Sequence, residues 1–132
     1  RLYRLGRGGL SRLTDDDSWI AEFVEGHPEI DPDSLANHPL RNVLTNVVGS
    51  TWGTDVHIQE QPIEDGDVLL LTTDGVHGAI DDASLGRLLE EAWEPAGKAG
   101  SPCAAAERLV RAALDRGTRD NCTAVVARYW RD

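Results

Sequence analysis

The sequence lacks the features that mark several classes of protein. It contains no methionine and only two cysteines, Cys103 and Cys122, neither of which has a second Cys or a His at metal-ligand spacing. Neither a disulfide scaffold nor a zinc knuckle is therefore indicated. No apolar run approaches the roughly 20 residues that span a bilayer, so we expect no membrane-spanning helix.

Positive charge is also scarce, because 13 Lys and Arg residues face 23 Asp and Glu residues and leave a net charge of −10. An acidic surface repels a phosphate backbone, so nucleic acid is not an expected partner. Hydrophobic residues make up 40% of the chain, which is typical of a soluble globular protein. A length of 132 residues suffices for one hydrophobic core and not for two, so we expect a single domain over residues 1–132.

The start of the chain carries two further indications. No basic segment followed by an apolar one is present, so a cytoplasmic location is the expectation. The chain does not begin with methionine, and residues 1–5 already alternate between polar and apolar in the manner of a strand. We interpret the sequence as a piece of a longer chain.

Apolar patterns predict the strands. The clearest is residues 68–73, a near-continuous apolar run typical of a strand that is covered on both faces. Residues 1–13 alternate on either side of a glycine-rich turn and predict a hairpin. Residues 55–63 and 123–130 are also expected to be strands. Residues 42–49 fit either a strand or a helix, and we favour a strand.

Capping residues and apolar spacing predict the helices. The acids Asp15–Asp17 and Ser18 stand directly before an apolar run, and both residue types satisfy the free N–H groups of a first helical turn. Ser101 and Pro102 give a similar start signal, and Gly117 gives a stop. The expected helices occupy residues 17–26, 32–37, 82–93 and 102 to the stop at Gly117, with an exit loop over residues 94–100.

Two aspartates stand at the ends of predicted strands. Asp74 follows the strand over residues 68–73, and Asp120 precedes the strand over residues 123–130. If these strands are antiparallel neighbours, both carboxylates emerge at the same edge of the sheet. Carboxylate oxygens are the ligands that Mg²⁺ and Mn²⁺ prefer. Asp-Gly and Asp-Asn are also common in turns, so the residues alone leave a metal site and a pair of ordinary turns both open.

The other polar clusters have simpler explanations. Helix capping accounts for Asp15–Asp17, and Glu64–Asp67 has the composition of a turn. The histidines are scattered along the chain, which favours solvated or packed side chains over metal ligands: His27, His38, His57 and His77. The chain contains neither a Gly-x-Ser-x-Gly motif nor a glycine-rich phosphate loop, so no side-chain nucleophile is indicated.

Four sequence blocks together resemble a known enzyme family. In chain order they are Leu13–Ser18, His38–Thr45, Gly66–Val76 and Gly117–Val126. Their order and spacing resemble the C-terminal half of the metal-dependent type 2C (PPM) serine/threonine protein phosphatases, over essentially the whole chain. The resemblance implies an α+β fold, namely part of an α/β/β/α sandwich of antiparallel sheets flanked by helices, with the N-terminal half missing.

The resemblance also implies a chemistry. In that family the acids of the Asp-Gly and Asp-Asn motifs bind metal, which implies Asp74 and Asp120 as ligands here. The complete domain is then expected to hold two or more Mn²⁺ or Mg²⁺ ions at one edge between the sheets. The implied reaction is attack of a metal-activated water on phosphoserine or phosphothreonine in protein substrates.

The chain departs from the family pattern in two respects. The N-terminal half of the family normally supplies a metal-bridging Asp in an Asp-Gly-x-Gly-Gly motif, which has no counterpart here. Asp17 stands where the family usually has His. Residues 45–49 stand where it usually has Thr-Arg-Ala-Leu-Gly, so Asn46 takes the place of Arg. We therefore expect little activity from the chain alone. The alternative is a non-catalytic phosphatase-like module that binds a partner or senses metal.

Overall fold

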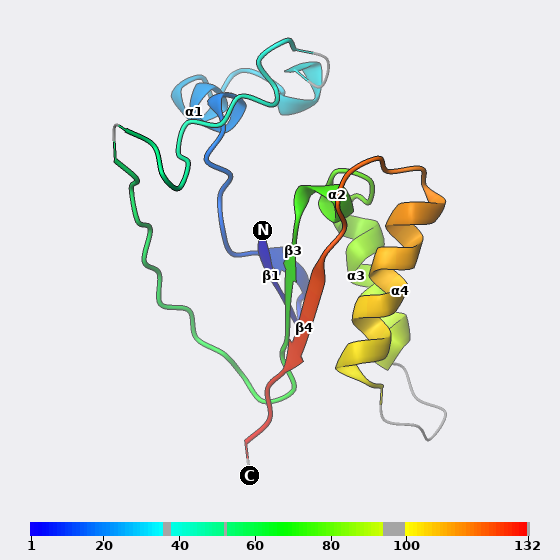
Figure 1. The fold of residues 1–132 in the computed structure, drawn as a ribbon. Helices are drawn as coiled ribbons and strands as arrows, with labels where there is room; N and C mark the ends of the chain where they lie inside the picture. The colour runs from blue at the N-terminus through cyan, green and yellow to red at the C-terminus, as the bar shows by residue number, and fades with distance from the viewer. Residues whose placement is uncertain (36–37, 52, 94–99, 132) are drawn as a thin grey trace. The chain divides into compact units, whose positions relative to one another are not determined.

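The computed structural model describes residues 1–35, 38–51, 53–93 and 100–131 (Figure 1). The chain forms two compact units: Arg1–Thr14 with Pro62–Asp132, and Asp15–Gln61. The first unit holds the sheet, and the second holds a short helix and a 3₁₀ turn. No helix among the described residues is long and apolar enough to cross a membrane. A single domain over residues 1–132 stays a prediction.

The first unit is built on an antiparallel four-stranded sheet in the order β2-β1-β3-β4. Its strands are β1 (Leu2–Gly6), β2 (Gly9–Arg12), β3 (Val68–Thr72) and β4 (Ala124–Arg128). The hairpin predicted over residues 1–13 is confirmed, with Gly9 at a φ of 93° in the turn. The predicted antiparallel pairing of the strands at 68–73 and 123–130 is confirmed as well.

Three helices accompany the sheet: α2 (Asp74–His77), α3 (Asp82–Trp93) and α4 (Pro102–Asp115). Helices α3 and α4 pack against each other on one side of the sheet (Figure 1). Helix α4 has Pro102 in its first turn and ends shortly before Gly117, whose φ of 78° favours glycine. Both predicted helices are therefore confirmed. Residues 94–99 of the predicted exit loop lie outside the described residues.

The hydrophobic core lies between these two helices and the sheet. Its largest fully buried side chains come from both layers: Tyr3, Leu70, Ile80, Leu85, Leu89, Leu109 and Val76. Successive β3 residues point to opposite faces, so Val68 and Leu70 enter this core whereas Leu71 stays 48% exposed. The described residues thus cover one face of β3, not the two faces that its apolar run predicts.

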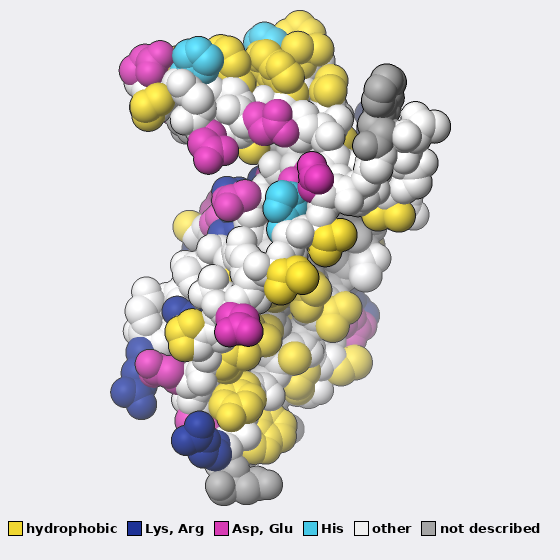
Figure 2. All heavy atoms as spheres, turned by 90° about the vertical axis from the view of Figure 1, so that its left-hand side faces the viewer, with side chains coloured by type: hydrophobic (Ala, Val, Ile, Leu, Met, Phe, Trp, Pro, Cys, Tyr) yellow, Lys and Arg dark blue, Asp and Glu magenta, His cyan; other side chains and the backbone are white. Residues whose placement is uncertain are grey.

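The other face of β3 and β4 is apolar and open. We call it the open face; it contains Leu69, Leu71, Val125 and Ala127, which are register partners on β3 and β4. Val125 is 54% exposed, and hydrophobic side chains gather on the side that Figure 2 shows, opposite α3 and α4. A soluble monomer rarely leaves such a patch uncovered.

We expect a second copy to cover the open face when residues 1–132 are produced alone. Sedimentation velocity should then show association that increases with protein concentration. Leu71→Lys places a charge in the centre of the open face and should return the chain to a monomer without changing its circular dichroism. A parent chain that sediments as a clean monomer would contradict this expectation.

The second unit contains α1 (Trp19–Gly26) and a 3₁₀ turn (Pro32–Leu35). Ser18 caps α1, because its Oγ accepts a hydrogen bond of 3.3 Å from the amide of Ala21. The Trp19 ring stacks on Phe23 and on His38, with centroid distances of 4.8 and 4.9 Å. The helix predicted over 17–26 is confirmed. Of the helix predicted over 32–37, residues 36 and 37 lie outside the described residues.

The strands predicted over residues 42–49 and 55–63 are wrong. The described residues of both segments contain no strand, and the only pairing recorded there is an isolated bridge between Ser18 and Leu44. The backbone bonds close turns instead, for example from the Ser50 amide to the Val47 carbonyl. Val48 is 96% exposed, so its apolar side chain marks no buried sheet face.

Candidate functional site

Asp74 and Asp120 lie at the same edge of the sheet. The last register pair between β3 and β4 joins Thr72 to Ala124, and the amide of Thr73 continues it by donating to the carbonyl of Thr123 at 3.1 Å. Asp74 follows the C-terminal end of β3, and Asp120 precedes the N-terminal end of β4. Antiparallel pairing therefore brings the two carboxylates to one edge, as the sequence predicts.

The loops that carry the two aspartates contact each other directly. The Thr73 hydroxyl donates to the carbonyl of Asn121 at 2.9 Å. Cys122 Sγ lies 3.3 Å from the carbonyl oxygen of Gly75 and 3.5 Å from that of Asp120. A Cβ added to Gly75 would lie 2.4 Å from the Asn121 carbonyl oxygen, so no larger residue fits at position 75 without movement.

Both carboxylates are exposed, and each is oriented by a neighbouring amide. Asp74 Oδ1 accepts a hydrogen bond of 3.0 Å from Gly75 N, and Asp120 Oδ1 accepts one of 2.7 Å from Asn121 N. Within the described part of the chain, the second oxygen of each carboxylate has no hydrogen bond. Each carboxylate therefore has one oxygen atom available as a ligand. Carboxylate oxygens are the type of ligand that Mg²⁺ and Mn²⁺ prefer.

These two aspartates alone do not make a complete metal site. Among the described residues, no group of three or more His, Cys, Asp or Glu side chains is placed to hold a metal ion. Mg²⁺ commonly keeps several waters and takes one or two protein carboxylates. Asp74 and Asp120 can therefore contribute to a site, while a binuclear centre needs further ligands from outside this group.

The one-turn helix α2 anchors Asp74 and was not predicted. The amide of Gly78 donates to the Asp74 carbonyl at 2.7 Å, and Thr72 Oγ1 lies 2.9 Å from His77 Nδ1. The sequence did not reveal this helix, because four residues are too few to show helical periodicity and Asp-Gly is also common in turns. The helical turn fixes the backbone from which the Asp74 carboxylate projects.

Two other acidic residues have structural roles. Asp67 is 5% exposed and its Oδ2 accepts a hydrogen bond from Glu64 N at 2.9 Å, which confirms the predicted turn. Asp81 caps α3, since its carboxylate accepts from the amide of Ser84 at 2.8 Å and from the Ser84 hydroxyl at 2.9 Å. These two bonds hold the pKa of Asp81 below its usual value.

The Asp81 cap predicts a pH dependence of stability. A lowered folded-state pKa means that the cap stabilises the fold above the ordinary value of 3.8 and loses this effect as the pH falls further. We expect Asp81→Ala to lower the thermal midpoint clearly at pH 6 and less at about pH 2.5. Differential scanning calorimetry at the two pH values measures this. An equal loss at both would contradict the role of the charged cap.

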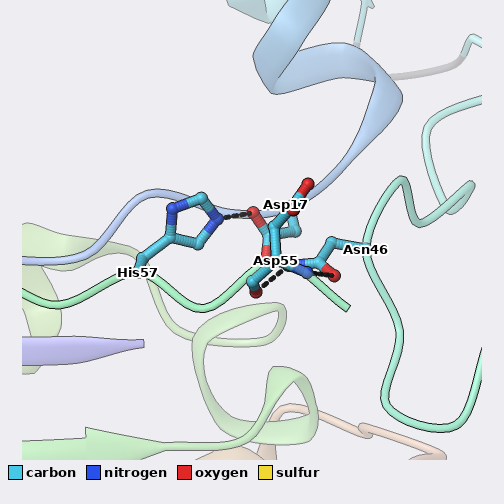
Figure 3. Close-up of polar contacts among 4 residues, drawn as sticks. All are labelled: Asp17, Asn46, Asp55 and His57. Carbon is cyan, nitrogen blue, oxygen red and sulfur yellow. Dashed lines mark hydrogen bonds and ion pairs between the residues drawn. The ribbon is translucent and has the colours of Figure 1, made fainter. Parts of the chain in front are cut away.

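A second polar cluster lies in the unit formed by residues 15–61 (Figure 3). Asp17 Oδ2 accepts a hydrogen bond of 2.8 Å from Asn46 Nδ2, and its Oδ1 lies 3.1 Å from His57 Nε2. The Asn46 amide also pairs with the backbone of Asp55, at 2.8 Å to its carbonyl and 3.1 Å from its amide. One carboxylate and one amide thus join three chain segments.

This cluster corrects the explanation of Asp17 as a helix cap. Ser18 provides the cap, and the Asp17 carboxylate binds Asn46 instead. Asp17 and Asn46 are two of the positions at which the chain departs from the family pattern, and they contact each other. The Asn46 amide closes the loop from residue 46 to residue 55 in place of a strand pair.

Comparison with known proteins shows what the chain is similar to. No family model matches the chain. The chain is 30% identical over 129 residues, 96% of its length, to the serine/threonine protein phosphatase PstP of Mycobacterium tuberculosis. It superposes on the PPM Ser-Thr phosphatase MsPP from Mycobacterium smegmatis with a TM-score of 0.75 at 33% identity over 98% of the chain. Over this portion of their length, the chain is similar to serine/threonine phosphatases of the PPM family.

The chain corresponds to a portion of these PPM proteins. It covers 52% of MsPP, 23% of the tuberculosis PstP and 35% of the serine/threonine phosphatase stp of Listeria innocua, to which it is 29% identical over 90 residues. It also matches the PstP catalytic domain in complex with two manganese ions, with a TM-score of 0.73 at 27% identity over 50% of that chain. The predicted α+β PPM fold is confirmed.

Proposed function

We propose that this chain is part of a metal-dependent phosphatase that hydrolyses phosphoserine and phosphothreonine in protein substrates. The observation that carries the proposal is the direct contact between the Asp74 and Asp120 loops at one sheet edge. The relatives support the reaction class, because PstP, MsPP and stp are all named serine/threonine phosphatases. The manganese ions of the PstP catalytic domain support the choice of metal.

In this proposal Asp74 and Asp120 hold Mn²⁺ or Mg²⁺ through the carboxylate oxygens that the Gly75 and Asn121 amides leave free. When bound, such a metal pair lowers the pKa of a water and neutralises phosphoryl oxygens. The protein's own contribution is orientation. Strand pairing, the α2 turn and the glycine at position 75 hold both carboxylates in place, which reduces the ordering cost of metal binding.

A second candidate is a phosphatase-like module that binds a partner or senses metal without catalysis. The Asp17 and Asn46 cluster favours it, because two departures from the family pattern occur there and the two side chains are hydrogen-bonded to each other. The two candidates differ in one property, namely whether the complete protein turns over a phosphorylated substrate.

The deciding experiment is phosphate release from a phosphothreonine peptide by the protein extended to its native start. We expect release that requires added Mn²⁺ and stops with excess EDTA. The unphosphorylated peptide and a metal-free reaction serve as controls. Folded protein that releases no phosphate with Mn²⁺ or Mg²⁺ would reject the phosphatase and favour the binding module.

A further inference from the structure

Thr73 occupies the N-cap position of α2 but does not cap it. A threonine at an N-cap ordinarily accepts a hydrogen bond from the second or third helical amide. The Thr73 side chain makes no such bond, although its backbone has the extended conformation of an N-cap, with φ −81° and ψ 164°. A capping bond generally stabilises a helix, and the Thr73 side chain makes a different contact in its place.

The hydroxyl instead joins the two aspartate loops. It donates to the Asn121 carbonyl at 2.9 Å and accepts from the Thr123 amide at 2.9 Å. The hydroxyl thus acts both as a donor and as an acceptor, and both partners lie in the segment that follows Asp120. The Thr73 amide adds a third bond, to the Thr123 carbonyl at 3.1 Å.

These three bonds connect residues that adjoin the two carboxylates. Thr73 directly precedes Asp74, and Asn121 directly follows Asp120. The Asn121 amide donates to Asp120 Oδ1, and the Asn121 carbonyl accepts from the Thr73 hydroxyl. The backbone of Asn121 therefore links Thr73 to the Asp120 carboxylate. A shift of the Thr73 hydroxyl would change the separation of the two aspartates.

We propose that Thr73 is a positioning residue that sets the spacing of the Asp74 and Asp120 carboxylates for one metal ion. This inference rests on the proposed function. The hydroxyl acts through the backbone of residues 121–123 and does not touch the metal. Partners that orient metal ligands in this way typically change metal affinity by 10–100-fold when they are removed.

The test is Mn²⁺ binding by the protein extended to its native start, measured by isothermal titration calorimetry. We expect Thr73→Val, which keeps the shape and removes the hydroxyl, to raise the Kd for Mn²⁺ about 10-fold or more. Thr73→Ser restores the hydroxyl and should bind within about 2-fold of the parent. Thr73→Ala gives a second hydroxyl-free protein, and the metal-free thermal midpoint of each variant verifies folding.

Thr51→Val is the matched control, because Thr51 lies in the other unit and its side chain has no hydrogen bond among the described residues. Its Kd should equal that of the parent. If the parent binds Mn²⁺ and folded Thr73→Val and Thr73→Ala bind it equally well, the positioning role is overturned and the proposed function stands. A parent that binds no Mn²⁺ overturns both.

Discussion

Asp74→Asn should abolish Mn²⁺-dependent phosphate release by the protein extended to its native start. Loss of a partner that merely orients a ligand costs 10–100-fold, so loss of the ligand itself should lower kcat/KM by about 100-fold or more. The change replaces one charged oxygen with an amide and leaves the size of the side chain unaltered. The Gly75 amide can still donate to the remaining oxygen, so folding should be preserved.

Asp120→Asn should have the same effect. Asp120 lies at the same sheet edge, and its Oδ1 accepts a hydrogen bond from the next amide just as that of Asp74 does. Asp115→Asn is the matched control, since Asp115 is an exposed carboxylate at the end of α4. Steady-state rates at several Mn²⁺ concentrations separate weaker metal binding from lost turnover. Full activity of Asp74→Asn at the parent's Mn²⁺ requirement would show that Asp74 is not a ligand.

Gly75→Ala should destabilise the fold and separate the aspartate loops. The added methyl carbon would lie 2.4 Å from the Asn121 carbonyl oxygen and 3.2 Å from the carbonyl carbon of Asp120. Both neighbours are backbone atoms, so the strand ends must move apart. Overpacking of this kind typically costs 1–3 kcal/mol. Urea unfolding of the parent and the variant measures the loss.

Gly8→Ala is the control for Gly75→Ala, because a Cβ at position 8 meets nothing within 4 Å. Its stability should match that of the parent to within about 0.5 kcal/mol. We also expect Gly75→Ala to lose Mn²⁺-dependent activity even where it remains folded. A Gly75→Ala protein with parental stability and activity would contradict the close contact between the loops.

The sheet unit could be predicted largely from the sequence because its signals are local and strong. The apolar run of β3 and the apolar face of α3 report directly on burial, and Pro102 and Gly117 mark the ends of α4. Burial then follows from geometry, since alternate strand residues and every third or fourth helix residue share a face. Among the described residues one face of β3 is covered, and the covering of its second face stays a prediction.

The unit over residues 15–61 could not be predicted in the same way. Its valines and isoleucines alternate like strand residues, but side-chain bonds from Asn46 and Asp17 provide the closure that a strand ladder would give. Contacts between positions 29 residues apart leave no trace in local periodicity. The apolar side chains of this unit therefore misled the strand prediction.

The positions of the two aspartates followed from a rule about antiparallel strand ends, and the structure places them at one edge. The contacts that fix the spacing of these aspartates could not be predicted from the sequence. In the sequence, Thr73 is an ordinary threonine at the end of a predicted strand, and Cys122 directly precedes another predicted strand. Their hydrogen bonds to the opposite loop depend on the register between β3 and β4, which cannot be deduced from local sequence patterns.

The most direct test is a double-mutant cycle on Mn²⁺ affinity in the protein extended to its native start. Parent, Asp74→Asn, Asp120→Asn and the double variant are titrated by calorimetry, with thermal midpoints to verify folding. If both carboxylates bind one ion, each single change should weaken binding about 10-fold or more, and the double change should cost clearly less than the sum. Parental affinity in either single variant would contradict a shared metal site.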